Sequence, residues 1–247
     1  MRLDEEEHVF YQKRYFEINH KKSMQPSDSP YIERQTARVI RWGNLSKKEK
    51  IIDIGCGIGK YTLNLHRKGY RIEGLDIAQG LLEQLQKHNS TDRLLPVHCA
   101  DVAKPPAELS NQFDVAIGFF ALHHMFDLQE SFRGIAKLLK PGGRLLFLEP
   151  NPYNLLYYLQ ILFTPKMTWQ GDKGILKMRS SILFPALRQA AFEELSIRRS
   201  GFFPPLIDNL KGALLIEQFL ERFPLWNPLL PFQLILAKKK GRKCAFF

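Results

Sequence analysis

Cysteine is scarce in this sequence, and the positions of the few cysteines exclude two kinds of site. Cys56, Cys99 and Cys244 are the only three in 247 residues, and no two of them form a C-x-x-C pair. A cysteine-type zinc site and a disulfide framework both need closely spaced cysteines. We therefore expect no metal site and a reducing, cytoplasmic compartment.

Long hydrophobic runs are also missing. The longest apolar stretches, such as Leu155 to Phe163, fall well short of the roughly 20 residues that a membrane-spanning helix needs. Residues 4–7 are all acidic, where a secretory signal would carry a basic and then an apolar segment. These features predict a protein that is neither transmembrane nor exported.

Basic residues outnumber acidic ones. Lysine and arginine together number 36 against 25 acidic residues, which gives a net charge of +11 at pH 7. This balance is consistent with nucleic acid, anionic lipid or phosphorylated partners, and equally with solubility alone. Much of the excess lies in Lys238, Lys239, Lys240, Arg242 and Lys243, where a solvated tail is the ordinary alternative.

Between residues 51 and 150, short β-branched runs alternate with helical stretches. This alternation is typical of parallel strands joined by crossover helices, and Pro141-Gly142-Gly143 predicts a turn before the fifth strand. The predicted strands are Ile51 to Ile54, Arg71 to Leu75, Leu95 to His98, Phe113 to Ile117, Arg144 to Leu148, Glu194 to Arg199 and Phe232 to Lys238. The predicted helices are Tyr31 to Trp42, Gly59 to Lys68, Ile77 to His88, Gln129 to Leu139 and Ser181 to Ala190.

We expect one α/β domain with a doubly wound, Rossmann-like sheet of seven mostly parallel strands and helices on both faces. Residues 151–180 and 202–231 are rich in Pro, Phe, Tyr, Leu and Trp and do not continue the alternation of strands and helices. They predict a partly helical cap beside the sheet or, equally, segments that close the core. The other parts are a helical lead-in at 1–50, a core at 51–150, final sheet elements at 181–201 and 232–240, and a tail at 241–247.

Residues 51–59 read Ile-Ile-Asp-Ile-Gly-Cys-Gly-Ile-Gly, a buried type of strand that runs into a glycine-rich turn. Glycines let the backbone approach a ligand closely, and a following helix offers free N–H groups. A tight turn without a ligand is the alternative. The spacing differs from the dinucleotide fingerprint G-x-G-x-x-G, because Lys60 stands where the third glycine of that fingerprint would fall.

Asp53 lies two residues before the first glycine of this turn. A carboxylate there repels a pyrophosphate but attracts a positively charged amino acid group. S-adenosylmethionine (SAM) is cationic at that end and carries no phosphate. The residues therefore favour SAM over a nicotinamide dinucleotide.

Two more acidic residues follow predicted strands. Asp76, with Ile77 beside it, ends the second strand, where a carboxylate can accept hydrogen bonds from both ribose hydroxyls; a helix N-cap is the alternative, and the roles are compatible. Asp101 follows the third strand and can accept from an adenine amino group while the Val102 N–H donates to a ring nitrogen. A turn or cap role is the alternative for Asp101. Acids after three successive strands favour a nucleoside cofactor.

Six segments carry a family resemblance: Asp53 to Gly59, Gly74 to Asp76, Ala100-Asp101, Phe113 to Val115, Ala121 to His124 and Leu139 to Gly143. In order and spacing they resemble the motifs of class I SAM-dependent methyltransferases, over about residues 50 to 150. The likeness is greatest to the small-molecule and lipid-pathway branch that includes ubiquinone and menaquinone biosynthesis methyltransferases. It implies that SAM is bound by Asp53, Gly55, Cys56, Gly57 and Gly59 near the methionine moiety, Asp76 and Ile77 at the ribose, Asp101 and Val102 at the adenine, and Phe119 in the pocket.

The sequence departs from relatives in two places. Enzymes that methylate base amines usually show Asn or Asp followed by Pro-Pro-Tyr after the fourth strand, and here that place reads Gly118-Phe119-Phe120-Ala121. This favours O- or C-methylation over base N-methylation. In addition, Ala190-Ala191-Phe192 stands where relatives often have Ala-Gly-Phe, which leaves the turn there in question.

His123 and His124 follow the fourth strand, and either can take a proton from the acceptor. A general base contributes typically 10²–10⁴-fold, whereas packing and turn capping are the alternative roles. The sulfonium already activates the methyl group, so positioning alone can supply roughly 7–11 kcal/mol and a base is optional. On position, we expect His124 to lie nearer the transferred methyl group than His123.

The acceptor is expected to be a small molecule, apolar or lipid-linked, that enters beneath the cap, and the basic tail can add peripheral contact with an anionic membrane. Nucleic acid is disfavoured because the aromatic residues cluster in apolar segments rather than among basic ones. A noncatalytic SAM-binding module and an RNA methyltransferase are the alternative functions.

Overall fold

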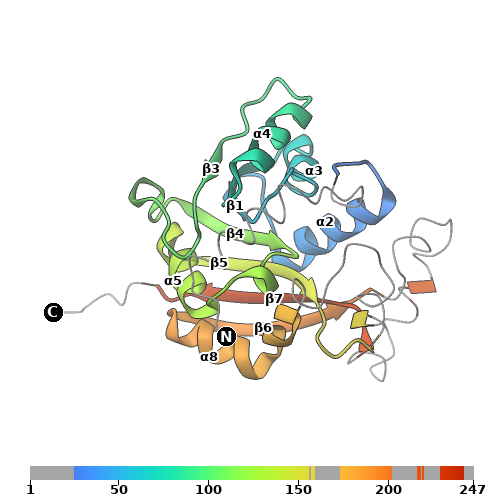
Figure 1. The fold of residues 1–247 in the computed structure, drawn as a ribbon, viewed down its shortest axis with the longest axis vertical. Helices are drawn as coiled ribbons and strands as arrows, with labels where there is room; N and C mark the ends of the chain where they lie inside the picture. The colour runs from blue at the N-terminus through green and yellow to red at the C-terminus, as the bar shows by residue number, and fades with distance from the viewer. Residues whose placement is uncertain are drawn as a thin grey trace.

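The computed structural model describes residues 25–155, 157–158, 173–201, 216–217, 219 and 229–241. Its centre is a seven-stranded sheet in the order β3-β2-β1-β4-β5-β7-β6, in which β7 alone runs antiparallel to its neighbours (Figure 1). The predicted doubly wound, mostly parallel sheet is confirmed. The strands are β1 (Lys50–Ile54), β2 (Arg71–Asp76), β3 (Val97–Cys99), β4 (Phe113–Phe119), β5 (Leu139–Pro150), β6 (Phe192–Ser200) and β7 (Phe232–Lys239).

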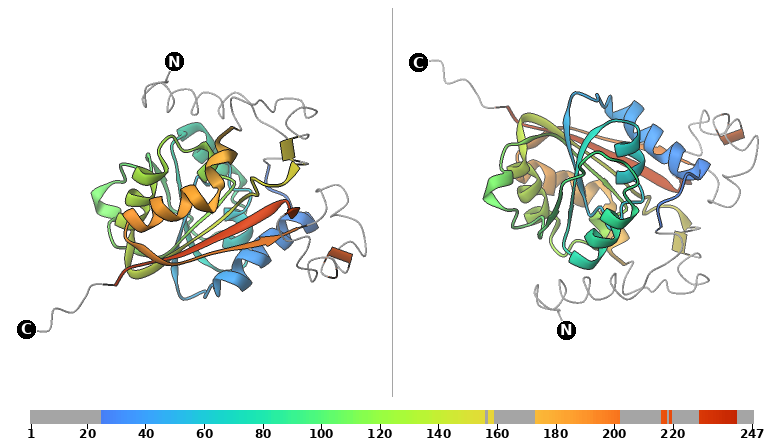
Figure 2. Two further views of the ribbon diagram at one scale, coloured as in Figure 1. Left: turned by 90° about the horizontal axis from the view of Figure 1, so that it is seen from below. Right: turned by 90° about the horizontal axis from the view of Figure 1, so that it is seen from above.

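Helices cover both faces of the sheet (Figure 2). Along β5, Leu145 and Phe147 belong to the core beneath one helical layer, whereas Leu146 and Leu148 belong to the core beneath the other. Burial on both faces explains why the strands are apolar nearly throughout. One layer holds α5 (Leu128–Leu138) and α8 (Ser180–Gln189), and the other holds α2 (Pro30–Gly43), α3 (Thr62–Arg67) and α4 (Gln79–His88).

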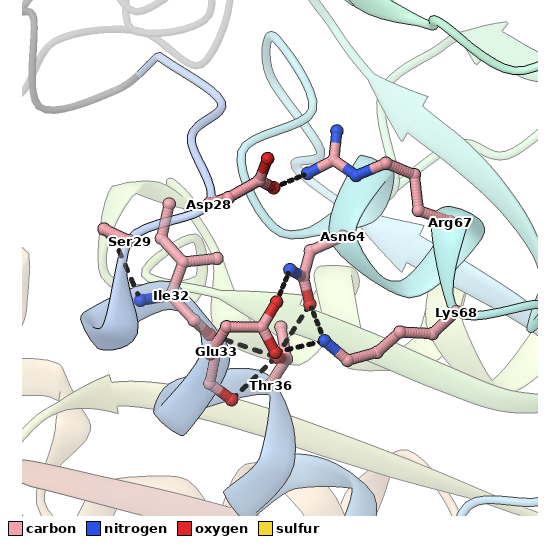
Figure 3. A network of polar contacts seen from close by, with 8 residues as sticks. All are labelled: Asp28, Ser29, Ile32, Glu33, Thr36, Asn64, Arg67 and Lys68. Atoms are coloured by element: carbon pink, nitrogen blue, oxygen red, sulfur yellow. Dashed lines mark hydrogen bonds and ion pairs between the residues drawn. The ribbon is translucent and has the colours of Figure 1, made fainter.

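A polar network anchors α2 on α3 (Figure 3). The Glu33 carboxylate accepts hydrogen bonds from Asn64 Nδ2, at 2.5 Å, and from the Lys68 ammonium, which holds the pKa of Glu33 below its usual value. The Thr36 hydroxyl donates to Asn64 Oδ1 at 2.9 Å. The network fixes the first turns of α2, which place Tyr31 at the edge of the sheet where the parallel strands end.

Several predicted boundaries shift by one or two residues, among them β3, α4 and β6, and two larger shifts have local reasons. The helix predicted from Gly59 is shorter, because the glycine turn continues and α3 begins at Thr62. The turn predicted at 141–143 lies inside β5. Leu139 and Arg144 of β5 both pair with β4, but residues 140–143 between them do not. The questioned turn before β6 is present with Ala191 at φ 63°, a left-handed conformation that glycine adopts more easily.

Most of the predicted cap and tail, namely 156, 159–172, 202–215, 218, 220–228 and 242–247, lies outside the described residues. The described margins of the two cap segments are joined, since Asn151 donates from its backbone N to Pro231 O at 2.8 Å and from Nδ2 to Leu230 O at 2.7 Å. In the described ranges, no helix combines the length and the apolar character needed to cross a membrane.

Candidate cofactor site and active site

The glycine turn after β1 is shaped by backbone conformation. Gly55, Gly57 and Gly59 have φ angles of 71°, 52° and 86°, which residues with a side chain rarely adopt. A Cβ added at Gly55 would lie 2.7 Å from Ala121 Cβ, and one at Gly59 would lie 2.8 Å from Leu85 Cγ. A Cβ at Gly57 would meet no atom within 4 Å. The lack of a side chain at Gly55 and Gly59 therefore lets Ala121 and Leu85 pack closely against the turn. Gly57, in contrast, borders open space that a ligand can fill.

Asp53 is a buried carboxylate with an incomplete set of partners. Its side chain is 2% exposed, and the Thr62 hydroxyl donates to Oδ2 at 2.6 Å. Oδ1 is buried and accepts no hydrogen bond from any residue that the structure describes. Burial raises the pKa of Asp53 to about 7, and the nearby Asp76 carboxylate adds to the rise. A cationic group such as the ammonium of SAM would supply both the missing donor and the counter-charge.

Asp76 holds the glycine turn in place. Its Oδ2 accepts from the Gly57 N–H at 2.8 Å and its Oδ1 from the Ala78 N–H at 2.9 Å. The N-cap position of α4 is Ala78, so Asp76 orders the loop before the helix rather than capping it, and Ile77 continues that loop. The Ile77 N–H is a third backbone donor to this carboxylate, and because an ionised carboxylate has about four acceptor sites, capacity is left for a ribose hydroxyl. Burial raises the pKa of Asp76 as well.

The turn after β3 contains the two residues predicted at the adenine. Asp101 accepts from the Ala103 N–H at 2.9 Å, so it does stabilise a turn, as in the alternative role. Val102 is buried, and a Cβ added at Gly134 in α5 would lie 1.7 Å from its carbonyl oxygen. Gly134 therefore lets α5 approach this turn, a role that sequence reasoning missed. Its signal was an isolated glycine inside an amphipathic helix.

Two further predicted residues pack within the protein. The buried Phe119 ring, at the end of β4, stacks on the Tyr61 ring with centroids 4.3 Å apart and planes 12° apart. The Cys56 side chain is buried against β2, since a Cβ added at Gly74 would lie 2.8 Å from its Sγ. Cys56 can therefore meet a cofactor only through its backbone.

His123 is paired with a wholly buried carboxylate, Glu149, at the end of β5. Glu149 Oε1 accepts from the N–H groups of Ala121 and Leu122, each at 2.8 Å, and Oε2 lies 2.6 Å from His123 Nδ1. This network assigns the proton to Nδ1, so Nε2 keeps its lone pair. Sequence reasoning missed Glu149, although an acid that ends a buried strand was a signal for it.

The turn η3 (Leu122–His124) is held by a second short helix, η4 (Lys173–Met178). A Cβ added at Gly174 would lie 1.6 Å from His123 O, so the two turns touch through backbone atoms. Lys177 Nζ donates to Met125 O at 3.1 Å and to Phe126 O at 2.8 Å. The His124 ring packs on the His123 ring with centroids 3.9 Å apart.

The structure thus brings most of the predicted residues to one edge of the sheet. The glycine turn contacts Ala121, which precedes the histidines, and it is hydrogen-bonded to Asp76. The third strand joins through the Ala100 N–H, which donates to Asp76 O at 3.0 Å. The role of each residue toward SAM stays a prediction. Among the described residues, no group of three or more His, Cys, Asp or Glu side chains could hold a metal ion.

Comparison with known proteins gives a consistent result. Residues 52–147 match the family model described as a methyltransferase domain. The ubiquinone biosynthesis O-methyltransferase of Bordetella pertussis is 30% identical over 172 residues, which cover 66% of this chain and 69% of that protein. The biotin biosynthesis bifunctional protein BioHC of Saccharophagus degradans is 32% identical over 173 residues, covering 70% of this chain. The match spans only 30% of BioHC.

The fold agrees with these relatives. The crystal structure of a SAM-dependent methyltransferase of Thermotoga maritima, a possible histamine N-methyltransferase, is similar with a TM-score of 0.59 at 16% identity. The likeness covers 95% of this chain and 99% of that one. The predicted superfamily and its cofactor are confirmed: the chain belongs to the class I SAM-dependent methyltransferases.

Proposed function

We propose that this protein transfers the methyl group of SAM to an oxygen or carbon atom of a small-molecule acceptor. The observation that carries the proposal is the buried Asp53 carboxylate, whose Oδ1 has no donor among the described residues, beside a glycine turn where a Cβ at Gly57 would meet no atom within 4 Å. A buried acceptor without a partner costs free energy in the ligand-free protein. A cationic ligand removes that cost, and the amino acid end of SAM has the required charge.

Different residues of this chain would bind different parts of the cofactor. Asp53 and the turn around Gly57 would hold the amino acid end, and Asp76 would accept from a ribose hydroxyl. Asp101 and Val102 would hold the adenine. When bound, SAM supplies a methyl group that its sulfonium charge has already activated.

We propose His123, rather than His124, as the group that takes the acceptor proton. The Glu149 carboxylate fixes the His123 ring and would stabilise the imidazolium that forms, because Nδ1–H donates to Oε2. This places the free lone pair on Nε2. Position along the chain alone had favoured His124, but the carboxylate partner that orients a base belongs to His123.

The acceptor is proposed to be apolar, in keeping with the named activity of the ubiquinone biosynthesis relatives. A separate proposal, that the acceptor is lipid-linked and the basic tail contacts an anionic membrane, does not rest on the two lysines of β7. Lys238 Nζ pairs with Glu194 at 3.0 Å, and Lys239 Nζ donates to Leu139 O at 2.6 Å. These two lysines of β7 are thus engaged within the sheet. Flotation with anionic and with neutral liposomes tests the membrane proposal directly.

The function is tested by incubating the protein with labelled SAM and a pool of small-molecule acceptors. Mass spectrometry should find S-adenosylhomocysteine together with a labelled product, and His123→Ala should lower the yield without weakening SAM binding. SAM binding without S-adenosylhomocysteine from any pool would indicate a noncatalytic SAM-binding module. Labelled RNA with unlabelled small molecules would indicate the RNA methyltransferase.

A further inference from the structure

Lys177, in η4, donates hydrogen bonds to the chain that follows the η3 turn. Its Nζ lies 3.1 Å from Met125 O and 2.8 Å from Phe126 O. Met125 is extended, with φ −70° and ψ 138°, and α5 begins only at Leu128, so neither carbonyl belongs to a helix. Burial lowers the pKa of Lys177, while the nearby Asp127 carboxylate acts in the opposite direction. The half-buried ammonium thus serves as the donor for two carbonyls outside regular structure.

The η3 turn is a single turn of 3₁₀ helix with few hydrogen bonds of its own. His124 N donates to Ala121 O at 3.1 Å, and Met125 N donates to Leu122 O at 3.0 Å. Such turns have poorer hydrogen-bond geometry than an α-helix, and one turn gains too few bonds to offset the ordering of its residues. The conformation of the turn that carries His123 therefore depends on contacts from other elements.

Two elements hold this turn, one through its N–H groups and one through its carbonyl groups. Glu149, at the end of β5, accepts from two backbone N–H groups at the start of the turn. The backbone of η4 packs at Gly174 on His123 O, and Lys177 donates to the carbonyls of residues 125 and 126. Because Glu149 Oε2 is also the partner of His123 Nδ1, a shift of the turn changes the geometry of that pair.

We infer that Lys177 is a positioning residue, which fixes the end of the η3 turn so that His123 stays paired with Glu149 and presents Nε2 to the acceptor. The inference rests on the proposed function, in which His123 takes the acceptor proton. Lys177 acts only through the turn and binds neither SAM nor the acceptor. A misplacement of about 1 Å can lower the rate of an enzyme by about 10²-fold. Removing the Lys177 ammonium should therefore slow methyl transfer and leave cofactor binding intact.

The test compares two substitutions that differ in what the end of the side chain can donate. Lys177→Met keeps the apolar stem but has no donor, whereas Lys177→Arg keeps the charge and the donors. The first readout needs no acceptor, because the 2.6 Å hydrogen bond between His123 Nδ1 and Glu149 should give a proton resonance far downfield in the NMR spectrum. His123→Ala assigns this resonance by its loss.

Exchange of this proton with water should be about tenfold faster in Lys177→Met, since the loss of a charge-assisted hydrogen bond shifts a local opening equilibrium by about that factor. Lys177→Arg should restore slow exchange. The second readout is turnover with labelled SAM and the acceptor pool that tests the proposed function. Lys177→Met should form labelled product about tenfold or more slowly at unchanged S-adenosylhomocysteine affinity, and Lys177→Arg should recover most of the rate.

The matched control is Lys239→Met, because Lys239 also donates to a backbone carbonyl, Leu139 O, but at the opposite edge of the sheet. That variant should leave both readouts unchanged. Urea unfolding checks that every variant is folded. If Lys177→Met does not fold, Lys177→Gln replaces it, and the same comparison with Lys177→Arg decides.

The inference would be overturned by a wild type without the downfield resonance, by unchanged exchange in Lys177→Met, or by an equal change in Lys239→Met. A change that Lys177→Arg does not reverse, or a loss of S-adenosylhomocysteine affinity, would show that Lys177 supports the fold in general rather than the turn. If exchange depends on Lys177 but neither the wild type nor any variant forms labelled product, the positioning role stands and only the proposed function fails.

Discussion

Asp53→Asn should make the ligand-free protein more stable and at the same time weaken its binding of SAM. The substitution keeps the size of the side chain and an oxygen that can accept from the Thr62 hydroxyl, but it removes the charge. In the ligand-free protein that charge is buried with Oδ1 unsatisfied among the described residues. Opposite effects on stability and affinity are expected when a site is built for its ligand rather than for the fold.

The magnitude follows from the pKa of Asp53, which is raised from 3.8 to about 7. Since each pKa unit corresponds to about 1.4 kcal/mol, the ionised side chain destabilises the folded state by up to about 4 kcal/mol. The folded state holds the proton more tightly than the unfolded state. Its stability therefore falls as pH rises from about 4 to about 7, and the full cost is present above pH 7. Asp53→Asn removes this cost.

Affinity for SAM has the opposite pH dependence, because the ammonium binds the ionised form of Asp53. With a pKa of about 7, the ionised fraction falls about tenfold between pH 8 and pH 6, and SAM affinity should fall with it. In Asp53→Asn this pH dependence should flatten. At pH 8 the affinity should be lower by about 10- to 150-fold, the loss of one charged hydrogen bond worth roughly 1.5–3 kcal/mol.

Urea unfolding at pH 5 to 8 and calorimetric titration with SAM measure the two effects. The control is Asp114→Asn at the opposite edge of the sheet, where hydrogen bonds from Lys140 and from the Lys50 N–H help to hold the pKa of Asp114 below its usual value. That variant should lose stability and keep its SAM affinity. If Asp53→Asn bound SAM as tightly as the wild type, or were less stable at pH 8, the reasoning about Asp53 would be wrong.

Three further substitutions test other parts of the site and fold. Asp76→Ala removes the acceptor of the Gly57 N–H and the proposed ribose acceptor, so calorimetry should find at least about tenfold weaker SAM binding; unchanged affinity in a folded variant would refute the assignment. Gly174→Ala places a Cβ 1.6 Å from His123 O and should lower turnover at unchanged S-adenosylhomocysteine affinity; unchanged turnover would remove η4 from the site. Ala191→Gly should raise the free energy of unfolding by about 1 kcal/mol, measured in urea, because φ at this residue is 63°; destabilisation would contradict it.

The cofactor half of the site could be predicted because its residues are close in sequence and its backbone demands are unusual. Three glycines in five positions, directly after a buried strand, have few uses other than a turn with positive φ angles. Acids that end successive parallel strands must lie at one edge of the sheet. The exact partners could not be predicted, because the bond from Gly57 to Asp76 depends on how β1 and β2 pair, which is set by the fold.

The contacts around His123 could not be predicted from the sequence, because they join segments that are distant along the chain. Glu149 lies 26 residues after His123, and Gly174 lies in the segment 151–180, which does not continue the alternation of strands and helices. Nothing in the local sequence pattern distinguishes two adjacent histidines, so the expectation for His124 rested on its position alone. Only the pairing of β4 with β5, in which Phe119 is opposite Leu148, brings the Glu149 carboxylate to the following turn.

The two halves of the site also differ in the physics that specifies them. The cofactor half relies on backbone conformations that few residues adopt, so its residue types form a motif that survives at low identity. The acceptor half relies on side-chain packing and charge, as in the pair of His123 and Glu149, and many residue sets satisfy such contacts. A family match therefore identifies the cofactor more readily than the acceptor. In this chain the buried Asp53 carboxylate, whose Oδ1 has no donor among the described residues, suits the cation of SAM.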